Sequence, residues 1–152
     1  MIKLIDTKMK KILLVIILLF SFFSWGQSIF DNPITGTNPN TANPYTTGQT
    51  VNANITVSGI GRGSGITGTN ANDRYNANSW DTASLDNTAY FEFTLTPNSG
   101  YQINFTNFIY TGQASGTGAT NVAFRSSVDG FTANIGTPTI SGTTISLVAA
   151  NY

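Results

Sequence analysis

The chain has 152 residues and contains neither histidine nor cysteine, which excludes the commonest general base, a thiol nucleophile and most zinc sites. Beyond residue 26, three arginines stand against six acidic side chains, a net charge of about −3. This balance excludes the clustered basic surface that binding to nucleic acid or to anionic lipid requires.

The start of the chain has the order of a secretory signal peptide. Four lysines between residues 3 and 11 precede an apolar run at 12–23, and Ser24 and Gly26 then place small residues at the two positions that a signal peptidase inspects. A membrane-spanning helix needs about 20 apolar residues, and this run is shorter. We therefore predict that residues 1–26 are removed before Gln27, that no membrane span remains, and that the protein is secreted or held at the cell surface.

The next segment, 27–49, is rich in Asn, Thr, Pro and Gly. Residues that precede proline favour extended conformations, so we predict an irregular lead-in with one short strand at Ile29 and Phe30. Residues 50–152 follow as a single β-rich module. Its first strand is predicted from apolar residues at alternate positions, namely Val51, Ala53, Ile55 and Val57.

Two further alternating segments lie on either side of a predicted turn at 97–100. We expect them to form a hairpin, with a bulge near Asn107 and Phe108 where the alternation changes phase. The side chains predicted to face the interior are Phe91, Phe93, Leu95, Tyr101, Ile103 and Phe105.

The last third of the module predicts a strand that Val122 and Phe124 mark and that ends at Asp129 and Gly130. Short strands follow at 131–135 and 140–148, with a turn at Ser141 and Gly142. No window after residue 26 has helical periodicity. The predicted fold class is all-β, an antiparallel β-sandwich of the jelly-roll type. A β-solenoid is the alternative, but the sequence has no fixed repeat.

Four stretches resemble an extracellular β-sandwich module of secreted and surface proteins of Bacteroidota, which is often followed by a sorting domain for type IX secretion. They lie at 54–63, 74–80, 90–101 and 124–131. Similar modules continue with further strands beyond the one that ends here near Leu147. The resemblance therefore implies that the sandwich in this chain is incomplete at its C-terminus.

Catalysis has little support in the sequence. Glu92 is the one glutamate, and it alternates with apolar neighbours as an outward carboxylate does. The glycines from Gly63 to Gly68 match the spacing of a dinucleotide-binding turn, but no helix follows to direct amides at a pyrophosphate. We predict no catalytic residue and no cofactor.

A loop with aromatic, amide and charged groups is the predicted binding face: Arg74, Tyr75, Asn78 and Trp80. These residue types recognise sugars, so polysaccharide or another surface glycan is the predicted partner, in a module for adhesion or carbohydrate binding. In the alternative, Tyr75 and Trp80 close one end of the sandwich, and the module is a structural spacer without a ligand.

Four aspartates are candidates for a calcium site. Asp73, Asp81, Asp86 and Asp129 could contribute to a calcium site, but their spacing matches no known calcium loop, so we predict turn residues and no metal. The tripeptide centred on Thr82 resembles the acceptor for O-glycosylation of exported proteins in Bacteroidota, with Thr82 as the modified residue.

Overall fold

A computed structural model describes residues 28–81 and 83–150; the predicted signal peptide and Thr82 lie outside this part. All strands that pair do so antiparallel. The prediction of an all-β antiparallel fold is therefore confirmed. The strands are β1 (Phe30–Asp31), β2 (Thr50–Val51), β3 (Ile55–Val57), β4 (Gly61–Arg62), β5 (Thr67–Gly68), β6 (Ala77–Asn78), β7 (Phe91–Glu92), β8 (Leu95–Pro97), β9 (Asn107–Gln113), β10 (Thr139–Ser141) and β11 (Thr144–Ala150), with one 3-10 turn, η1 (Ser127–Asp129).

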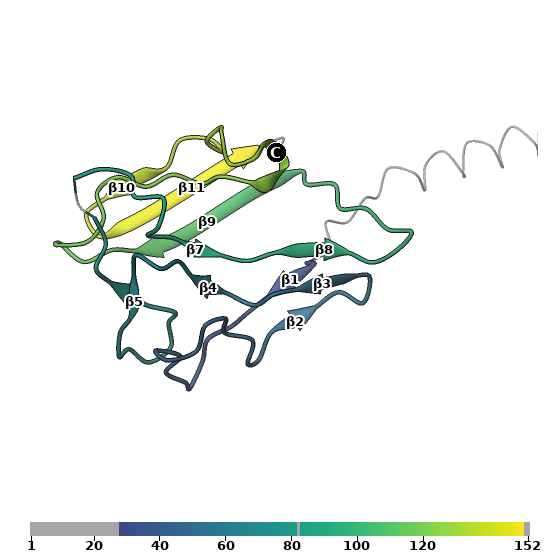
Figure 1. The fold of residues 1–152 in the computed structure, drawn as a ribbon, viewed down its shortest axis with the longest axis horizontal. Helices are drawn as coiled ribbons and strands as arrows, with labels where there is room; N and C mark the ends of the chain where they lie inside the picture. The colour runs from purple at the N-terminus through teal and green to yellow at the C-terminus, as the bar shows by residue number, and fades with distance from the viewer. Residues whose placement is uncertain (1–27, 82, 151–152) are drawn as a thin grey trace, which may run out of the picture.

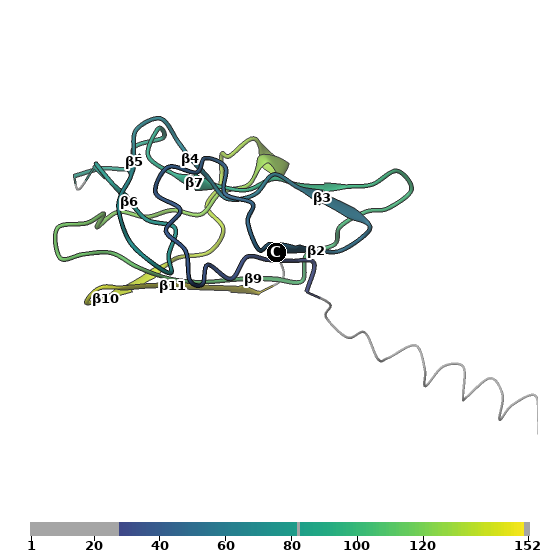
Figure 2. The ribbon, with the colours of Figure 1, turned by 90° about the horizontal axis from the view of Figure 1, so that it is seen from below.

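The strands lie in two layers, as in a sandwich (Figures 1 and 2). One layer is a three-stranded sheet in the order β10-β11-β9. The other contains the pairs β4–β7 and β3–β8, which follow one another along the same two chain segments. Within the described residues, no helix is long and apolar enough to cross a membrane.

Alternation along β11 explains the burial in the three-stranded sheet. Ile145 and Leu147 are 6% and 3% exposed, whereas Val148, on the other face, is 73% exposed. On the inner face, the ring of Phe124 lies 4.7 Å from that of Tyr110 in β9. The predicted turn between the last two strands is confirmed, and Gly142 takes a positive φ there.

The predicted first strand is interrupted. The Asn52 side chain accepts a hydrogen bond from the backbone amide of Asn54, and the Asn52 carbonyl accepts one from the backbone amide of Ile55. This turn separates β2 from β3. The lead-in pairs through β1 with β2. It also supplies Tyr45, which is 4% exposed and forms an antiparallel bridge with Ile60. The lead-in is therefore part of the packed fold.

The predicted hairpin is wrong, although its turn is present. The amide of Tyr101 donates to the carbonyl of Asn98, and Gly100 has a positive φ. However, β8 pairs with β3, and residues 101–106 form no strand. They lead into β9, in the other layer (Figure 2). The phase change near Asn107 marks the start of β9 rather than a bulge, because β9 pairs with β11 without interruption.

Four of the predicted core aromatics are also wrong. Phe91, Phe93 and Phe105 are 39%, 46% and 41% exposed, and Tyr101 is exposed in the loop, while Ile103 is half-buried. Their alternation is that of an inner face, but burial depends on a covering layer that local sequence does not report. The facing sheet ends at β9, with which no further strand pairs among the described residues.

The segment between β9 and β10 is also less regular than predicted. Neither 122–124 nor 131–135 forms a strand. Instead Phe131 follows η1 with a positive φ and is exposed, and the amide of Ile135 donates to the carbonyl of Phe124. This segment thus serves to place the Phe124 ring on the inner face of the sheet.

The buried polar residue of the N-terminal half is Arg62 in β4, which is 7% exposed. Its guanidinium donates hydrogen bonds to the carbonyls of Asn76 (3.0 Å), Ala42 (2.9 Å) and Pro39 (3.3 Å). Its central carbon lies 3.6 Å from the centroid of the Tyr75 ring. One side chain therefore joins the lead-in, β4 and the loop before β6.

These contacts offset the free-energy cost of burying the positive charge of Arg62. Burial lowers the pKa of the Arg62 guanidinium, an effect that the neighbouring Tyr75 opposes, and an arginine remains protonated despite such a shift. Carbonyl dipoles and the face of an aromatic ring both stabilise the cation. Gly68 permits this approach, because a Cβ there would lie 3.0 Å from the guanidinium carbon.

We predict that Arg62→Lys lowers the free energy of unfolding by about 2–4 kcal/mol, since an ammonium cannot match the fork of donors or stack on the ring. Urea denaturation measures this loss. The control is Arg74→Lys, because Arg74 is exposed and its Nε donates only a 3.4 Å hydrogen bond to Asn72. Equal stability of the two variants would contradict the structural role of Arg62.

A second prediction concerns alkaline pH. Burial raises the pKa of Tyr110 above the ordinary value of about 10. The unfolded chain therefore loses this proton first, so the stability contribution is complete below about pH 10 and decreases as the pH rises toward the raised pKa. Denaturation at pH 8 and pH 10.5 should show a smaller decrease for Tyr110→Phe than for the unmodified chain. An equal decrease for the two proteins would contradict burial of the Tyr110 hydroxyl as the cause.

Candidate functional site

Glycines at alternate positions form one face of the β4 segment: Gly59, Gly61, Gly63 and Gly65. A Cβ on Gly63 would lie 2.3 Å from the carbonyl oxygen of Thr88 and 2.7 Å from the ring of Tyr90. Glycine is therefore required by the close approach of the neighbouring strand. Since β5 rather than a helix follows, these glycines form no dinucleotide-binding turn.

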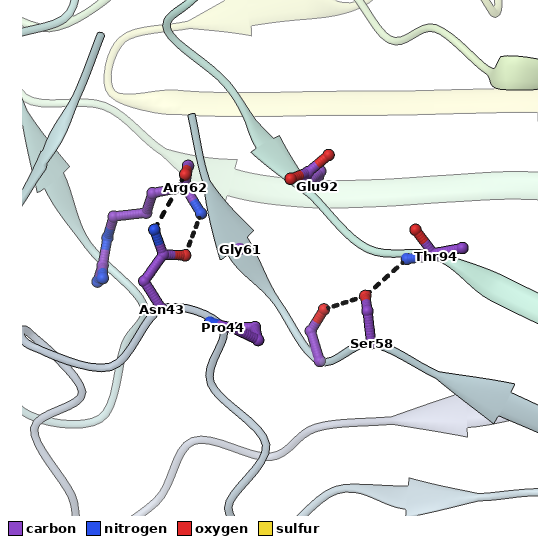
Figure 3. A pocket seen from close by; sticks show the side chains of 8 residues that line it. Asn43, Pro44, Ser58, Gly61, Arg62, Glu92 and Thr94 are labelled. Atoms are coloured by element: carbon purple, nitrogen blue, oxygen red, sulfur yellow. Dashed lines mark hydrogen bonds between the residues drawn. The ribbon is translucent and has the colours of Figure 1, made fainter. Parts of the chain in front are cut away.

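An open cleft of about 290 Å³ lies over two of these glycines (Figure 3). Gly59 and Gly61 form its floor. Asn43 and Pro44 of the lead-in line one side, and Ser58, Glu92 and Thr94 line the other; the backbone of Arg62 completes the lining. Alternation in β7 places Glu92 on the face opposite to Phe91. The cleft thus lies on the outer face of its layer.

Hydrogen bonds hold both sides of the cleft. The side-chain amide of Asn43 accepts a hydrogen bond from the Arg62 backbone nitrogen (2.7 Å) and donates one to the Arg62 carbonyl (3.1 Å), as the backbone of a neighbouring strand would. The Ser58 hydroxyl donates to the Gly59 carbonyl (2.8 Å) and accepts from the Thr94 amide (2.9 Å). The walls are therefore fixed by the same sheet that carries them.

Glu92 supplies the acidic side chain of the cleft. Glu92 is exposed, as the sequence predicts, and a Cβ placed on Gly61 would lie 3.3 Å from the Glu92 Cγ. The carboxylate accepts hydrogen bonds, and the Thr94 hydroxyl can donate and accept. The Ser58 hydroxyl already donates its proton to Gly59, so toward a ligand it can only accept. Hydrolysis of a glycoside ordinarily uses a pair of carboxyl groups. The lining residues include one carboxyl group, which can accept hydrogen bonds from a hydroxylated molecule.

The predicted binding loop is divided between two roles. The Tyr75 hydroxyl donates to the Ala42 carbonyl (3.1 Å), and its ring lies 5.5 Å from that of Phe91. Burial raises the pKa of Tyr75, and the charge of Arg62 opposes this shift. Trp80 is half-buried, donates from its indole nitrogen to Ala77 (3.0 Å) and meets Phe91 edge-on at 5.1 Å. Both rings thus pack within the fold.

The other two members of the predicted loop are exposed. Arg74 hydrogen-bonds to Asn72, and Asn78 accepts a hydrogen bond from Ser79. The structure therefore brings Tyr75 and Trp80 together on Phe91, while the side-chain hydrogen bonds of Arg74 and Asn78 are to near neighbours in the chain. The predicted glycosylation residue, Thr82, lies outside the described residues.

The four aspartates considered for calcium lie in separate turns. Asp81 accepts from the backbone of Ala83, and Asp129 accepts from the backbone of Ala133. Hydrogen bonds from Thr88 lower the pKa of Asp86, and those around Asp129, first from Ala133, lower its pKa likewise. Asp73 accepts from the amide of Gly36. Within the described ranges, no group of three acidic, histidine or cysteine side chains could hold a metal.

Sequence reasoning missed the cleft, although its signal is present. Glycines alternate on one strand, and Tyr90, Glu92 and Thr94 alternate on another. The pairing of Gly61 with Glu92 connects the two patterns, and it joins segments about thirty residues apart in the chain. Comparisons of the chain with protein-family models, with curated proteins and with solved structures find no match.

Proposed function

We propose that the chain is a non-catalytic module of an exported protein, at the cell surface or secreted, that binds a saccharide in the cleft over Gly59 and Gly61. The observation that carries this proposal is the lining of the cleft, in which a carboxylate and two hydroxyls surround a glycine floor. Its volume of about 290 Å³ lies near the lower end of the range for ligand sites, about 300 Å³.

The chemistry of the lining favours a hydroxylated ligand. Glu92 can accept from sugar hydroxyls, and charge-assisted hydrogen bonds are the stronger ones. Tyr90 lies two residues before Glu92, on the same face, with 40% of its surface exposed beside Gly63. Its ring offers an apolar plane next to the polar cleft, which suits the mixed surface of a pyranose.

Export is supported by the signal-peptide pattern at 1–26 and by the resemblance to extracellular modules of Bacteroidota. Adhesion to polysaccharide would then be the role of the module within a larger surface protein. The absence of histidine and cysteine from the sequence supports a role without catalysis.

The alternative is a structural spacer that binds no ligand. The packing of Tyr75 and Trp80 favours a structural spacer over a loop that binds a ligand, because both rings already stabilise the fold. The cleft, rather than this loop, is the feature that distinguishes the two functions.

A glycan array followed by titration of the best ligand tests the proposal. Saturable binding is expected, and Glu92→Gln should weaken it about tenfold or more, since a hydrogen bond to a charged group contributes about 1.5–3 kcal/mol. Asp31→Asn is the matched control, because it removes an equally exposed charge in β1.

The results distinguish the cleft from the predicted loop as the binding site, and a saccharide-binding module from a structural spacer. Loss of binding in Asn78→Ala with Glu92→Gln unaffected would move the site to the predicted loop. A folded protein that binds no glycan on the array would favour the spacer.

A further inference from the structure

One edge of the three-stranded sheet is open. The strand β9 spans Asn107–Gln113 and pairs with β11 over its whole length, and in the described part of the chain no strand pairs with its other edge. In an antiparallel strand, successive residues direct their N–H and C=O groups to opposite edges. About half of the β9 backbone groups therefore point away from β11.

This edge lacks the features that usually prevent pairing with another strand. Proteins protect edges with charged side chains, proline, bulges or short strands. The seven residues of β9 include no charge and no proline, and their pairing with β11 is continuous. A strand of this length and composition is a template for strand addition.

Apolar rings lie exposed on the same side of the molecule. In Figure 1, β7 and β8 run beside β9, and Figure 2 shows them in the facing layer. Phe93, between β7 and β8, is 46% exposed, although its ring lies 5.6 Å from that of Phe30 in β1. Phe91 shares its face and is also partly exposed. A strand added to β9 would place its inward side chains over these rings.

We propose that the free edge of β9 binds an extended, uncharged segment of another polypeptide, whose alternate side chains are apolar. The backbone of β9 specifies the extended conformation. The rings of Phe91 and Phe93 specify apolar groups on the inward face, and a charge placed there would lose its hydration without compensation. This proposal is independent of saccharide binding, since Glu92 and the cleft lie on the opposite face of β7.

The geometry favours a single strand over a second copy of the chain. In Figures 1 and 2, β1 and β2 lie on the open side of β9, at nearly the same level as β9. A second copy would bring its own three-stranded sheet into the layer that β1 and β2 occupy. One extended segment adds a single strand to the edge of β9 and brings no second sheet into that layer.

The test uses the purified protein and a fluorescent peptide with the sequence of residues 143–150. This sequence already pairs with β9 in the fold and carries Ile145, Leu147 and Ala149 on its inward face. Fluorescence anisotropy should show saturable binding, and hydrogen exchange should show new protection at alternate amides of β9. A peptide with Leu147→Lys should bind at least tenfold more weakly.

Two protein variants locate the site. Phe93→Glu should weaken binding of the peptide at least tenfold, because it places a carboxylate under the added strand. Ile109→Glu introduces the same charge on the outer face of β9, at a residue that is 63% exposed, and should bind as the unmodified protein does. If Phe93→Glu fails to fold, the Leu147→Lys peptide still tests the apolar face.

Three results would overturn the proposal. The first is an absence of peptide binding by a folded protein whose β9 amides exchange unchanged. The second is equal binding of the two peptides. The third is a concentration-dependent dimer with protected β9 amides in the absence of peptide, which would assign the edge to a second copy.

Discussion

The buried guanidinium of Arg62 is the interaction on which the N-terminal layer depends. Its acceptors, the carbonyls of Pro39, Ala42 and Asn76, belong to segments with little regular structure of their own. Short strands cannot stabilise such segments, because each closes few backbone hydrogen bonds. A multidentate cation does so by satisfying several buried carbonyls at once, and the Tyr75 ring provides an apolar face on which its plane can stack.

Arg62 lies between two faces of this layer that have different roles. Arg62 directs its side chain inward, while its backbone is held by the amide of Asn43 at the border of the cleft. The cation therefore fixes the position of Asn43 and Pro44 relative to Gly61 without contributing charge to the cleft. This leaves Glu92 to set the electrostatics of the outer face, and it explains how an irregular lead-in can form one wall of a binding site.

Local patterns in the sequence predict the fold class and the last strand pair, since alternation and a glycine turn specify β10 and β11 directly. They fail where pairing is long-range. The residues around Phe91 and Leu95 alternate as a hairpin strand would, but their partners are Arg62 and Val57. The candidate site was missed for the same reason, because its lining comes from three separate segments, the lead-in, the β4 segment and the β7 segment. Nor can a sequence show that the Arg62 guanidinium stacks on the Tyr75 ring.

The two layers differ in how completely their inner faces are covered. In the three-stranded sheet, Ile145 and Leu147 are buried and the Phe124 ring lies against Phe108 and Tyr110, whereas among the described residues Phe93 in the other layer has Phe30 as its ring neighbour. Exposed aromatic surface next to an unpaired edge is unfavourable in isolation, since both the rings and the backbone gain from a covering strand. Strand addition would act on the inner face alone. The cleft, held from the inner side by Arg62, would keep its geometry whether or not the edge of β9 is filled.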